Sequence, residues 1–212
     1  MAANQVYIVD YGMGNLHSAR KAIAAVGGDP VVTNDAALLA GAEKMILPGV
    51  GAFGDSMKNL QASGLVPVLL EHIRQGKPFL GICLGMQVLF EESEEAPGVP
   101  GLGILKGRVI RIPTTYKIPH MGWNNLTLQT PCPLLTGAGG QYVYFVHSYC
   151  CEPADRSIVT AVADYGWPVV AAVQQGNVLG FQFHPEKSGA VGIAMLRRFV
   201  ELDPDSLKGG RP

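Results

Sequence analysis

The segment that decides the fold is residues 79–87, FLGICLGMQ. A short apolar run without polar alternation leads directly into Cys83, and the apolar residues after it (Leu84, Val88 and Leu89) have helical spacing. Glycine stands two residues before and two residues after the cysteine. This is the spacing of a nucleophile elbow, with cysteine where hydrolases often carry serine. The segment therefore predicts a buried strand, a strained turn at Cys83 and a helix of an α/β fold.

The spacing around Cys83 suits a thiol nucleophile. A strained strand-to-helix turn brings backbone segments so close together that a Cβ no longer fits beside it. The N-terminus of the following helix favours a thiolate, and the backbone N–H of Leu84 would point towards an oxyanion. Without a base, the segment is equally compatible with a buried structural cysteine beside two packing glycines. A catalytic interpretation therefore requires a histidine elsewhere.

Short apolar runs alternate with helical segments through the first half of the chain. Expected strands lie at 6–9, 31–32, 45–47 and 79–82, and expected helices lie at 16–26, 36–40 and 66–74. Strands without polar alternation, separated by helices, are typical of a parallel sheet that is covered on both faces. We therefore expect an α/β fold with a mostly parallel central sheet.

The second half has a different pattern. Expected strands at 103–112, 141–146, 158–163, 169–173 and 178–183 follow one another with turn residues between them. This closeness indicates an antiparallel or mixed extension of the sheet. An amphipathic helix is expected at 188–202. We expect a single domain over residues 1–202 and a polar C-terminal tail at 203–212.

The sequence FQFHPE at 181–186 supplies the base that Cys83 requires. In an extended segment side chains alternate, so the two phenylalanines share one face while Gln182, His184 and Glu186 share the other. A thiol needs a base to accept its proton, and the base needs a carboxylate to fix its tautomer. Cys83, His184 and Glu186 fit these three roles and are the expected catalytic residues.

The other histidines are the alternatives to this assignment. His17, His72 and His120 lack a neighbouring arrangement of this kind, and each is expected to be structural or to face solvent. His147 is the one rival base, because it lies in the strand-end sequence VHSY at 146–149.

The glycine-rich sequence PGVG at 48–51 follows the third expected strand. In an α/β sheet this position borders the crevice at the carboxyl ends of the strands. Its backbone amides could supply a second oxyanion donor. A phosphate-binding loop is disfavoured because no Gly-Lys-Ser/Thr follows. A tight turn without any ligand remains an alternative.

Composition and charge exclude several classes of protein. The 212 residues are 48% hydrophobic and 16% charged, which is typical of a globular chain. The formal net charge of −1 gives no electrostatic reason to expect nucleic acid or an acidic membrane as a partner. Neither a secretory signal nor a run of about 18 apolar residues is visible. A soluble, cytoplasmic protein is therefore expected.

The remaining cysteines point to no metal site and no cofactor. Cys132, Cys150 and Cys151 form no CxxC pair and no metal-finger spacing with Cys83. The two adjacent cysteines would point to opposite faces of an extended strand. We expect the cysteines to be thiols rather than bridges, and we expect Cys150 and Cys151 to be ordinary strand or loop residues.

These motifs resemble the class I, triad-type glutamine amidotransferases over nearly the whole chain. The sequences GICLGMQ at 81–87 and HPE at 184–186 are similar to the motifs of the superfamily. Four further segments resemble the subgroup formed by the glutaminase subunits of imidazole glycerol phosphate synthase: DYGMGNL at 10–16, PGVG at 48–51, PHMGWN at 119–124 and FQFHPEKS at 181–188. The resemblance implies the flavodoxin-like fold of this family and a role in histidine biosynthesis.

The resemblance also implies roles for individual residues. Cys83 would attack the glutamine amide, His184 would transfer the proton and Glu186 would orient His184. The backbone amides of Val50 and Leu84 would hold the oxyanion. The residues that match glutamine-binding positions are Gly49, Gly51, Gln87, Ser148 and Tyr149. No metal or organic cofactor is implied.

The partner implied by the resemblance is a cyclase of the HisF type, a (β/α)8 barrel that would form a heterodimer with this chain. It would receive the ammonia through a protected channel. Asn15, Met121, Trp123 and Lys187 are candidates for the docking face, since aromatic anchors dominate interfaces. Core packing of Trp123 is the alternative.

Three other functions remain open on the sequence. The chain could be the glutaminase of another synthase, such as anthranilate or aminodeoxychorismate synthase or the pyridoxal phosphate synthase glutaminase. It could be a subunit that retains the fold for binding only. It could also be a thiol hydrolase or peptidase that acts without a partner.

Overall fold

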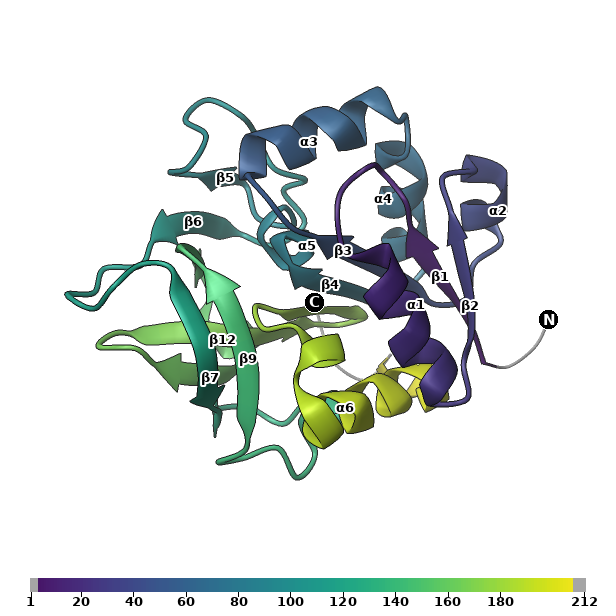
Figure 1. Cartoon of the computed structure of the whole chain (residues 1–212). Helices are drawn as coiled ribbons and strands as arrows, with labels where there is room; N and C mark the ends of the chain where they lie inside the picture. The colour runs from purple at the N-terminus through teal and green to yellow at the C-terminus, as the bar shows by residue number, and fades with distance from the viewer. Residues whose placement is uncertain (1–3, 208–212) are drawn as a thin grey trace.

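The protein is described here by a computed structural model that covers residues 4–207, and its elements are labelled in Figure 1. An eight-stranded sheet runs through the molecule in the order β2-β1-β3-β4-β13-β12-β11-β8. The strands are β1 (Gln5–Val9), β2 (Asp29–Thr33), β3 (Met45–Gly49), β4 (Phe79–Cys83), β8 (Thr127–Leu128), β11 (Val159–Asp164), β12 (Pro168–Gln175) and β13 (Val178–Phe181).

The direction of the strands divides this sheet into two parts. The pairs from β2 to β13 are parallel, whereas β13, β12, β11 and β8 pair antiparallel to one another. The mostly parallel sheet of the first half and its antiparallel extension are both confirmed. Because β13 lies beside β4, the segment with the His-Pro-Glu motif ends next to the strand that carries Cys83.

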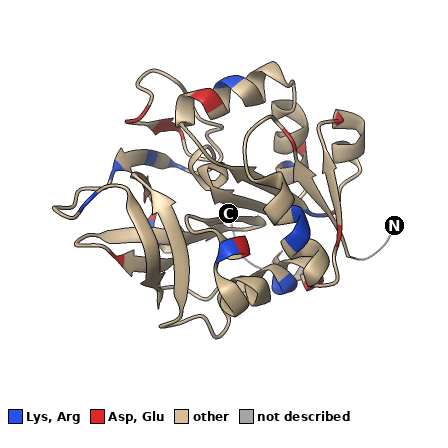
Figure 2. Ribbon diagram, viewed as in Figure 1, with Lys and Arg blue, Asp and Glu red and all other residues tan. Residues whose placement is uncertain are grey.

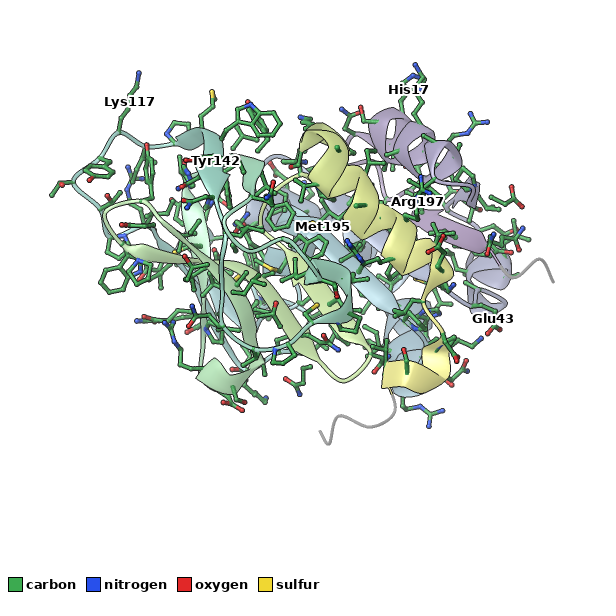
Figure 3. The ribbon with its side chains drawn as sticks, turned by 90° about the horizontal axis from the view of Figure 1, so that it is seen from below. His17, Glu43, Lys117, Tyr142, Met195 and Arg197 are labelled. Atoms are coloured by element: carbon green, nitrogen blue, oxygen red, sulfur yellow. The ribbon has the colours of Figure 1, made fainter. Side chains whose placement is uncertain are left out.

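Helices cover both faces of the sheet, as the lack of alternation predicts. On one face lie α1 (Leu16–Ala25) and α6 (Gly189–Glu201), which touch each other and share one apolar core. Figure 3 shows Met195 of α6 inside this layer and His17 of α1 projecting away from it. The helices α2 (Ala36–Ala40), α3 (Phe53–Ala62), α4 (Val66–Arg74) and α5 (Leu84–Gln87) contribute to a second core on the opposite face.

Two smaller sheets stand beside the central one. A three-stranded sheet contains β5 (Glu92–Ser93), β6 (Gly107–Arg111) and β10 (Tyr149–Pro153), and a two-stranded sheet pairs β7 (His120–Asn125) with β9 (Tyr142–His147). Short 3-10 turns occur at η1 (Pro133–Leu135), η2 (Arg156–Ile158), η3 (Pro185–Lys187) and η4 (Pro204–Leu207). The strands β7 and β9 lie together at one end of the molecule (Figure 1).

Several expected elements differ in extent from those observed. The strand expected at 103–112 is present only as β6, because the backbone of Ile104 and Leu105 donates to the carbonyl of Leu89 rather than to a sheet. The strand expected at 178–183 ends at Phe181, and the following backbone crosses to another strand, where the N–H of His184 donates to Tyr144. The helix α3 and the strand β7 were not predicted.

The C-terminal stretch packs on the domain as far as it is described. Leu207 of η4 is 5% exposed and belongs to the core beneath α1 and α6. Residues 208–212 of the expected tail lie outside the described residues. Within the described part of the chain, no helix has the length and apolarity needed to cross a membrane.

Candidate active site

Cys83 sits on a strained turn between β4 and α5. Its φ of 56° and ψ of −113° place it in a region that side-chain-bearing residues rarely adopt, and no other non-glycine residue among 4–207 has a positive φ. A Cβ on Gly81 would lie 2.6 Å from the carbonyl oxygen of Gly85, and a Cβ on Gly85 would overlap the carbonyl oxygen of Leu47. The nucleophile elbow and the need for both glycines are therefore confirmed in this structure.

His184 and Glu186 meet at the end of β13. The Nδ1 atom of His184 lies 2.8 Å from Oε1 of Glu186, and both side chains are at most 5% exposed. The contact is made across the 3-10 turn η3 rather than along an extended strand, because Pro185 begins that turn. The two phenylalanines beside His184 stack on each other at 4.7 Å inside the core, as the alternation predicts.

The ring of His184 is arranged to exchange a proton with Cys83. Burial lowers the pKa of His184, but its interactions with Cys83 and Glu186 outweigh this effect and raise the pKa to about 9. Since Nδ1 is engaged by Glu186, Nε2 is the nitrogen left for the thiol, and it is buried without a hydrogen-bond partner among the described residues. The carboxylate of Glu186, the imidazole of His184 and the thiol of Cys83 therefore follow one another in the order required for hydrolysis by a thiol nucleophile.

The ends of β3 and β4 bring the expected oxyanion donors to the same place. Gly49 is the register partner of Cys83, so Val50 continues from β3 beside the elbow, and Leu84 is the first residue of α5. The hydroxyl of Tyr11 donates to the carbonyl oxygen of Pro48 at 2.9 Å and fixes the peptide just before this loop. Burial raises the pKa of Tyr11 to about 12, so this hydroxyl remains a donor throughout the neutral range.

A cavity of about 230 Å³ opens beside the thiol. Six residues that were singled out from the sequence line it: Gly51, Cys83, Leu84, Gln87, Ser148 and Tyr149. Four lining residues had no assigned binding role: Glu95, Pro119, Val146 and His147. Gly49, Val50, His184 and Glu186 are not among its lining residues. A larger hollow of about 520 Å³, around Thr160 and Gln174, is lined by no cysteine and no histidine among the described residues.

A hydrogen-bonded chain of glutamines borders the sulfur. The Nε2 atom of Gln87 donates to the main-chain oxygen of Tyr149 and to Oε1 of Gln182, both at 2.9 Å. The Nε2 atom of Gln182 lies 3.7 Å from Sγ of Cys83. The alternation of side chains in residues 181–186 predicts that Gln182 lies on the same face as His184, but the sequence assigns no role to Gln182.

The structure decides between the two histidines that could act as the base. His147 donates through Nδ1 to the carbonyl oxygen of Tyr149 at 2.7 Å, so its Nε2 accepts the N–H of His120 Nδ1 at 3.1 Å. Burial lowers the pKa of His147 to about 3. Both ring nitrogens are therefore occupied and the ring is neutral, so His147 has no free nitrogen for a thiol proton, and His184 remains the candidate base.

Comparison with known proteins agrees with this geometry. The sequence model of the family "Glutamine amidotransferase class-I" matches residues 7–202. The chain belongs to the class I glutamine amidotransferases. It is 52% identical to the imidazole glycerol phosphate synthase subunit HisH of Methanothermobacter thermautotrophicus, over 93% of this chain and 98% of the relative. It is also 52% identical to the HisH subunit of Aquifex aeolicus, over 91% and 94% of the two chains.

Solved structures share the fold of this amidotransferase. A crystal structure of a glutamine amidotransferase has a TM-score of 0.74 at 22% identity and covers 96% of this chain and 98% of its own. The structure of PurLQS from Thermotoga maritima also has a TM-score of 0.74, at 20% identity, with 93% and 97% of the chains covered. These structures confirm the predicted fold, and the sequence matches confirm the predicted family and its glutaminase class of activity.

The acidic residues near the pocket of the amidotransferase mostly have structural partners. Figure 2 shows acidic residues gathered around β5, next to α3. Glu91 accepts the N–H of Gly107 and pairs with Lys106, while Glu94 accepts the N–H of Arg111. These contacts fix the loop that delivers Glu95 to the cavity.

Glu95 both caps α3 and lines the cavity beside Cys83. One carboxylate oxygen accepts the N–H of Phe53 at 2.8 Å and so caps α3, whose own N-cap residue Ala52 offers no side-chain oxygen. The same residue lines the cavity beside Cys83. Within the described part of the chain, no group of three or more His, Cys, Asp or Glu side chains could hold a metal ion.

The residues expected at a partner interface lie at the surface. Met121 is 61% and Trp123 is 55% exposed, which excludes core packing for Trp123. Asn15 and Lys187 are exposed as well. Asn15 also caps α1, where its side chain accepts the N–H of Ser18 at 3.2 Å.

Proposed function

We propose that this amidotransferase is the glutaminase subunit of an imidazole glycerol phosphate synthase and that Cys83, His184 and Glu186 carry out the hydrolysis. The observation that carries the chemistry is the strained Cys83 elbow beside the buried His184–Glu186 pair. The pathway rests on the relatives named as HisH subunits, which match along nearly their whole length.

The reaction would proceed through a thioester. His184 Nε2 takes the proton of the thiol, and Sγ of Cys83 attacks the side-chain carbonyl carbon of glutamine, so that a C–S bond forms and the carbonyl π electrons move to oxygen. The backbone N–H groups of Leu84 and Val50 stabilise that oxyanion. Collapse breaks the C–N bond, His184 returns the proton to nitrogen and ammonia leaves. Water then attacks the thioester carbonyl carbon with His184 as base, the C–S bond breaks, glutamate is released, and the proton on His184 is again shared with Sγ of Cys83.

The cavity supports recognition of a free amino acid. Glutamine carries an ammonium and a carboxylate on its α-carbon, and Glu95 offers the wall a negative charge that suits the ammonium group. Both Nε2 hydrogens of Gln87 are engaged, so its Oε1 is left as an acceptor. Backbone groups of Gly51, Ser148 and Tyr149 would hold the carboxylate end.

The ammonia would pass to a cyclase subunit, a HisF-type (β/α)8 barrel bound as a heterodimer. A docking face around β7 is supported by the exposed Met121 and Trp123, which project from the strand on the side opposite His120. Asn15 and Lys187 would lie at its border. The cyclase combines the ammonia with its nucleotide substrate to give imidazole glycerol phosphate and an aminoimidazole carboxamide ribotide.

The test is glutamate release by the purified subunit alone, with a cyclase barrel, and with the barrel plus its nucleotide ligand. We expect full activity only in the complete mixture. Cys83→Ala should abolish glutamate release but leave ammonia-dependent cyclisation intact, and Cys132→Ala, a buried thiol outside the cavity, should retain both activities. Glutamate release that is stimulated by another synthase subunit instead, or no glutamate release in any mixture, would refute the assignment to this pathway.

A further inference from the structure

The side chain of Gln182, which lies between two phenylalanines in the sequence, is polar but buried. Gln182 is fully buried, and its neighbours Phe181 and Phe183 stack on each other in the core. Burying an amide costs free energy unless hydrogen bonds replace those lost to water. Its backbone N–H donates to Ala171, so the main chain is held independently of the side chain. The partners of the side chain are Gln87 and the sulfur of Cys83.

The network fixes which end of the Gln182 amide faces the sulfur. The carbonyl oxygen of Tyr149 can only accept, so the atom of Gln87 that contacts it at 2.9 Å must be the nitrogen. The same nitrogen contacts Gln182, which makes the contacted atom of Gln182 its oxygen. The NH2 group of Gln182 is therefore the end that lies 3.7 Å from Sγ.

We propose that Gln182 is a further catalytic residue of this enzyme, which donates its side-chain N–H to the thiolate of Cys83, and that Gln87 holds it in that orientation. This inference rests on the proposed thiol chemistry. A hydrogen bond to sulfur is stronger when the sulfur is charged, so the donor favours the thiolate over the thiol. After the C–S bond forms, the sulfur is neutral and the interaction weakens.

The sulfur is thus held between two groups with different tasks. His184 accepts the thiol proton. The amide of Gln182 does not titrate, so it can only stabilise the negative charge that remains on the sulfur. The titratable groups around the sulfur and its cavity are His184, Tyr11, Cys151, His147, Tyr149 and Glu95. Gln182 is a donor of fixed charge state among them, so its effect should appear as a displacement of the pH profile.

The reactivity of Cys83 can be measured without glutamine. The probe is iodoacetamide, and the observable is the pH midpoint of Cys83 alkylation in the full-length subunit, read by mass spectrometry. Burial raises the pKa of the other thiols, Cys132 and Cys151, and raises that of Cys150 to about 12. They should therefore react slowly over the range in which Cys83 is titrated.

Gln182→Met removes the donor with little change in volume. We expect its alkylation midpoint to rise by about one pH unit, which makes alkylation about tenfold slower at pH values below both midpoints. Gln87→Met should raise the midpoint by a smaller amount, because Gln182 loses its orientation. The double variant should shift no further than Gln182→Met alone, since both changes act through one contact. Gln174→Met is the matched control and should leave the midpoint unchanged, because the amide of Gln174 on β12 contacts the carbonyl oxygen of Gly176 in the turn that follows.

Unfolding by urea is measured in parallel for each variant. A packing role alone would lower the stability of Gln182→Met and leave the alkylation midpoint where it is in the parent, and that result would overturn the proposal. Additive shifts in the double variant would overturn the orienting role of Gln87. If Cys83 of the parent protein were no more reactive than the other thiols, the proposed thiol chemistry would fail and the role of Gln182 with it, whereas a reactive parent with an unshifted Gln182→Met would count against Gln182 alone.

Discussion

His147 and Gln87 donate to the same acceptor, the main-chain oxygen of Tyr149, at 2.7 and 2.9 Å. The two donors arrive from different elements, His147 from the end of β9 and Gln87 from the end of α5. Both residues line the cavity beside Cys83. The carbonyl of Tyr149 is therefore held at the edge of that cavity by two hydrogen bonds, and through His147 it is connected to His120 on β7.

Replacing His147 should affect both stability and binding of glutamine. His147→Phe keeps a ring but removes the donor to Tyr149 and leaves the N–H of His120 without its acceptor. An unsatisfied buried donor costs about 1–3 kcal/mol, so we expect a loss of that order in the free energy of unfolding. We also expect a higher KM for glutamine in the presence of the cyclase, because the wall near Tyr149 is less well fixed.

His120→Phe is the comparison for this prediction. It removes the other end of the His120–His147 contact but leaves the bond from His147 to Tyr149 in place. Urea unfolding and steady-state kinetics should therefore show a loss of stability with little change in KM. Equal effects of the two variants on KM would show that the bond to Tyr149 does not shape the site.

Gly85 should be intolerant of any side chain. A methyl group there would overlap the carbonyl oxygen of Leu47 on β3, which is backbone and cannot move aside without shifting the sheet. We expect Gly85→Ala to lower the stability by about 3 kcal/mol or to prevent folding. In Gly41→Ala, the nearest atom is 3.5 Å away and φ is −83°, so a neutral or slightly stabilising effect is expected.

The charge of His184 should persist to unusually high pH. Its pKa is raised to about 9 by Cys83 and Glu186 against the opposing effect of burial. The stability that this shift contributes is complete below about pH 6.5 and is lost as the pH rises through 9, an effect on the order of 3 kcal/mol. In Glu186→Gln we expect a lower titration midpoint and a flatter dependence of stability on pH.

Proton NMR of the imidazole rings, with urea unfolding at several pH values, measures both effects. His72 serves as an internal reference, because its burial lowers its pKa to about 4 and its signals should stay constant over the same range. A midpoint near 6.5 for His184 in the parent protein would contradict the coupling to Cys83 and Glu186.

The sequence predicts those parts of the site whose residues lie close together in the chain. Cys83 with its glycines, and His184 with Glu186, each lie within one motif, so strand and turn geometry is enough to assign them. Their meeting depends on the parallel pairing of β4 with β13, which the sequence does not predict, because the pattern of the second half indicates only an antiparallel or mixed extension. The mostly parallel sheet of the first half was predictable, because its strands lack polar alternation and are separated by helices.

The parts that the sequence does not predict depend on long-range pairing. His120 and His147 become neighbours only through the antiparallel register of β7 with β9. Glu95 reaches the cavity because the loop around β5 is held by partners far along the chain. The helix α3 escaped prediction because its N-terminus is capped by Glu95 rather than by a residue next to it in sequence.

Trp123 should anchor the cyclase subunit. Its ring is 55% exposed on β7 and lies edge-on to Tyr144 at 6.1 Å, so it is held in place before a partner binds. Large, preorganised aromatic side chains contribute most to affinity at interfaces, and truncation of such an anchor costs about 2–4 kcal/mol. We expect Trp123→Ala to weaken binding of the cyclase by about 30-fold or more, measured by calorimetry with the purified barrel.

Leu70→Ala, which removes an exposed apolar side chain from α4, is the matched control and should bind as the parent does. If Trp123→Ala keeps its secondary structure and unfolding midpoint and still binds with parental affinity, the docking face is not at β7.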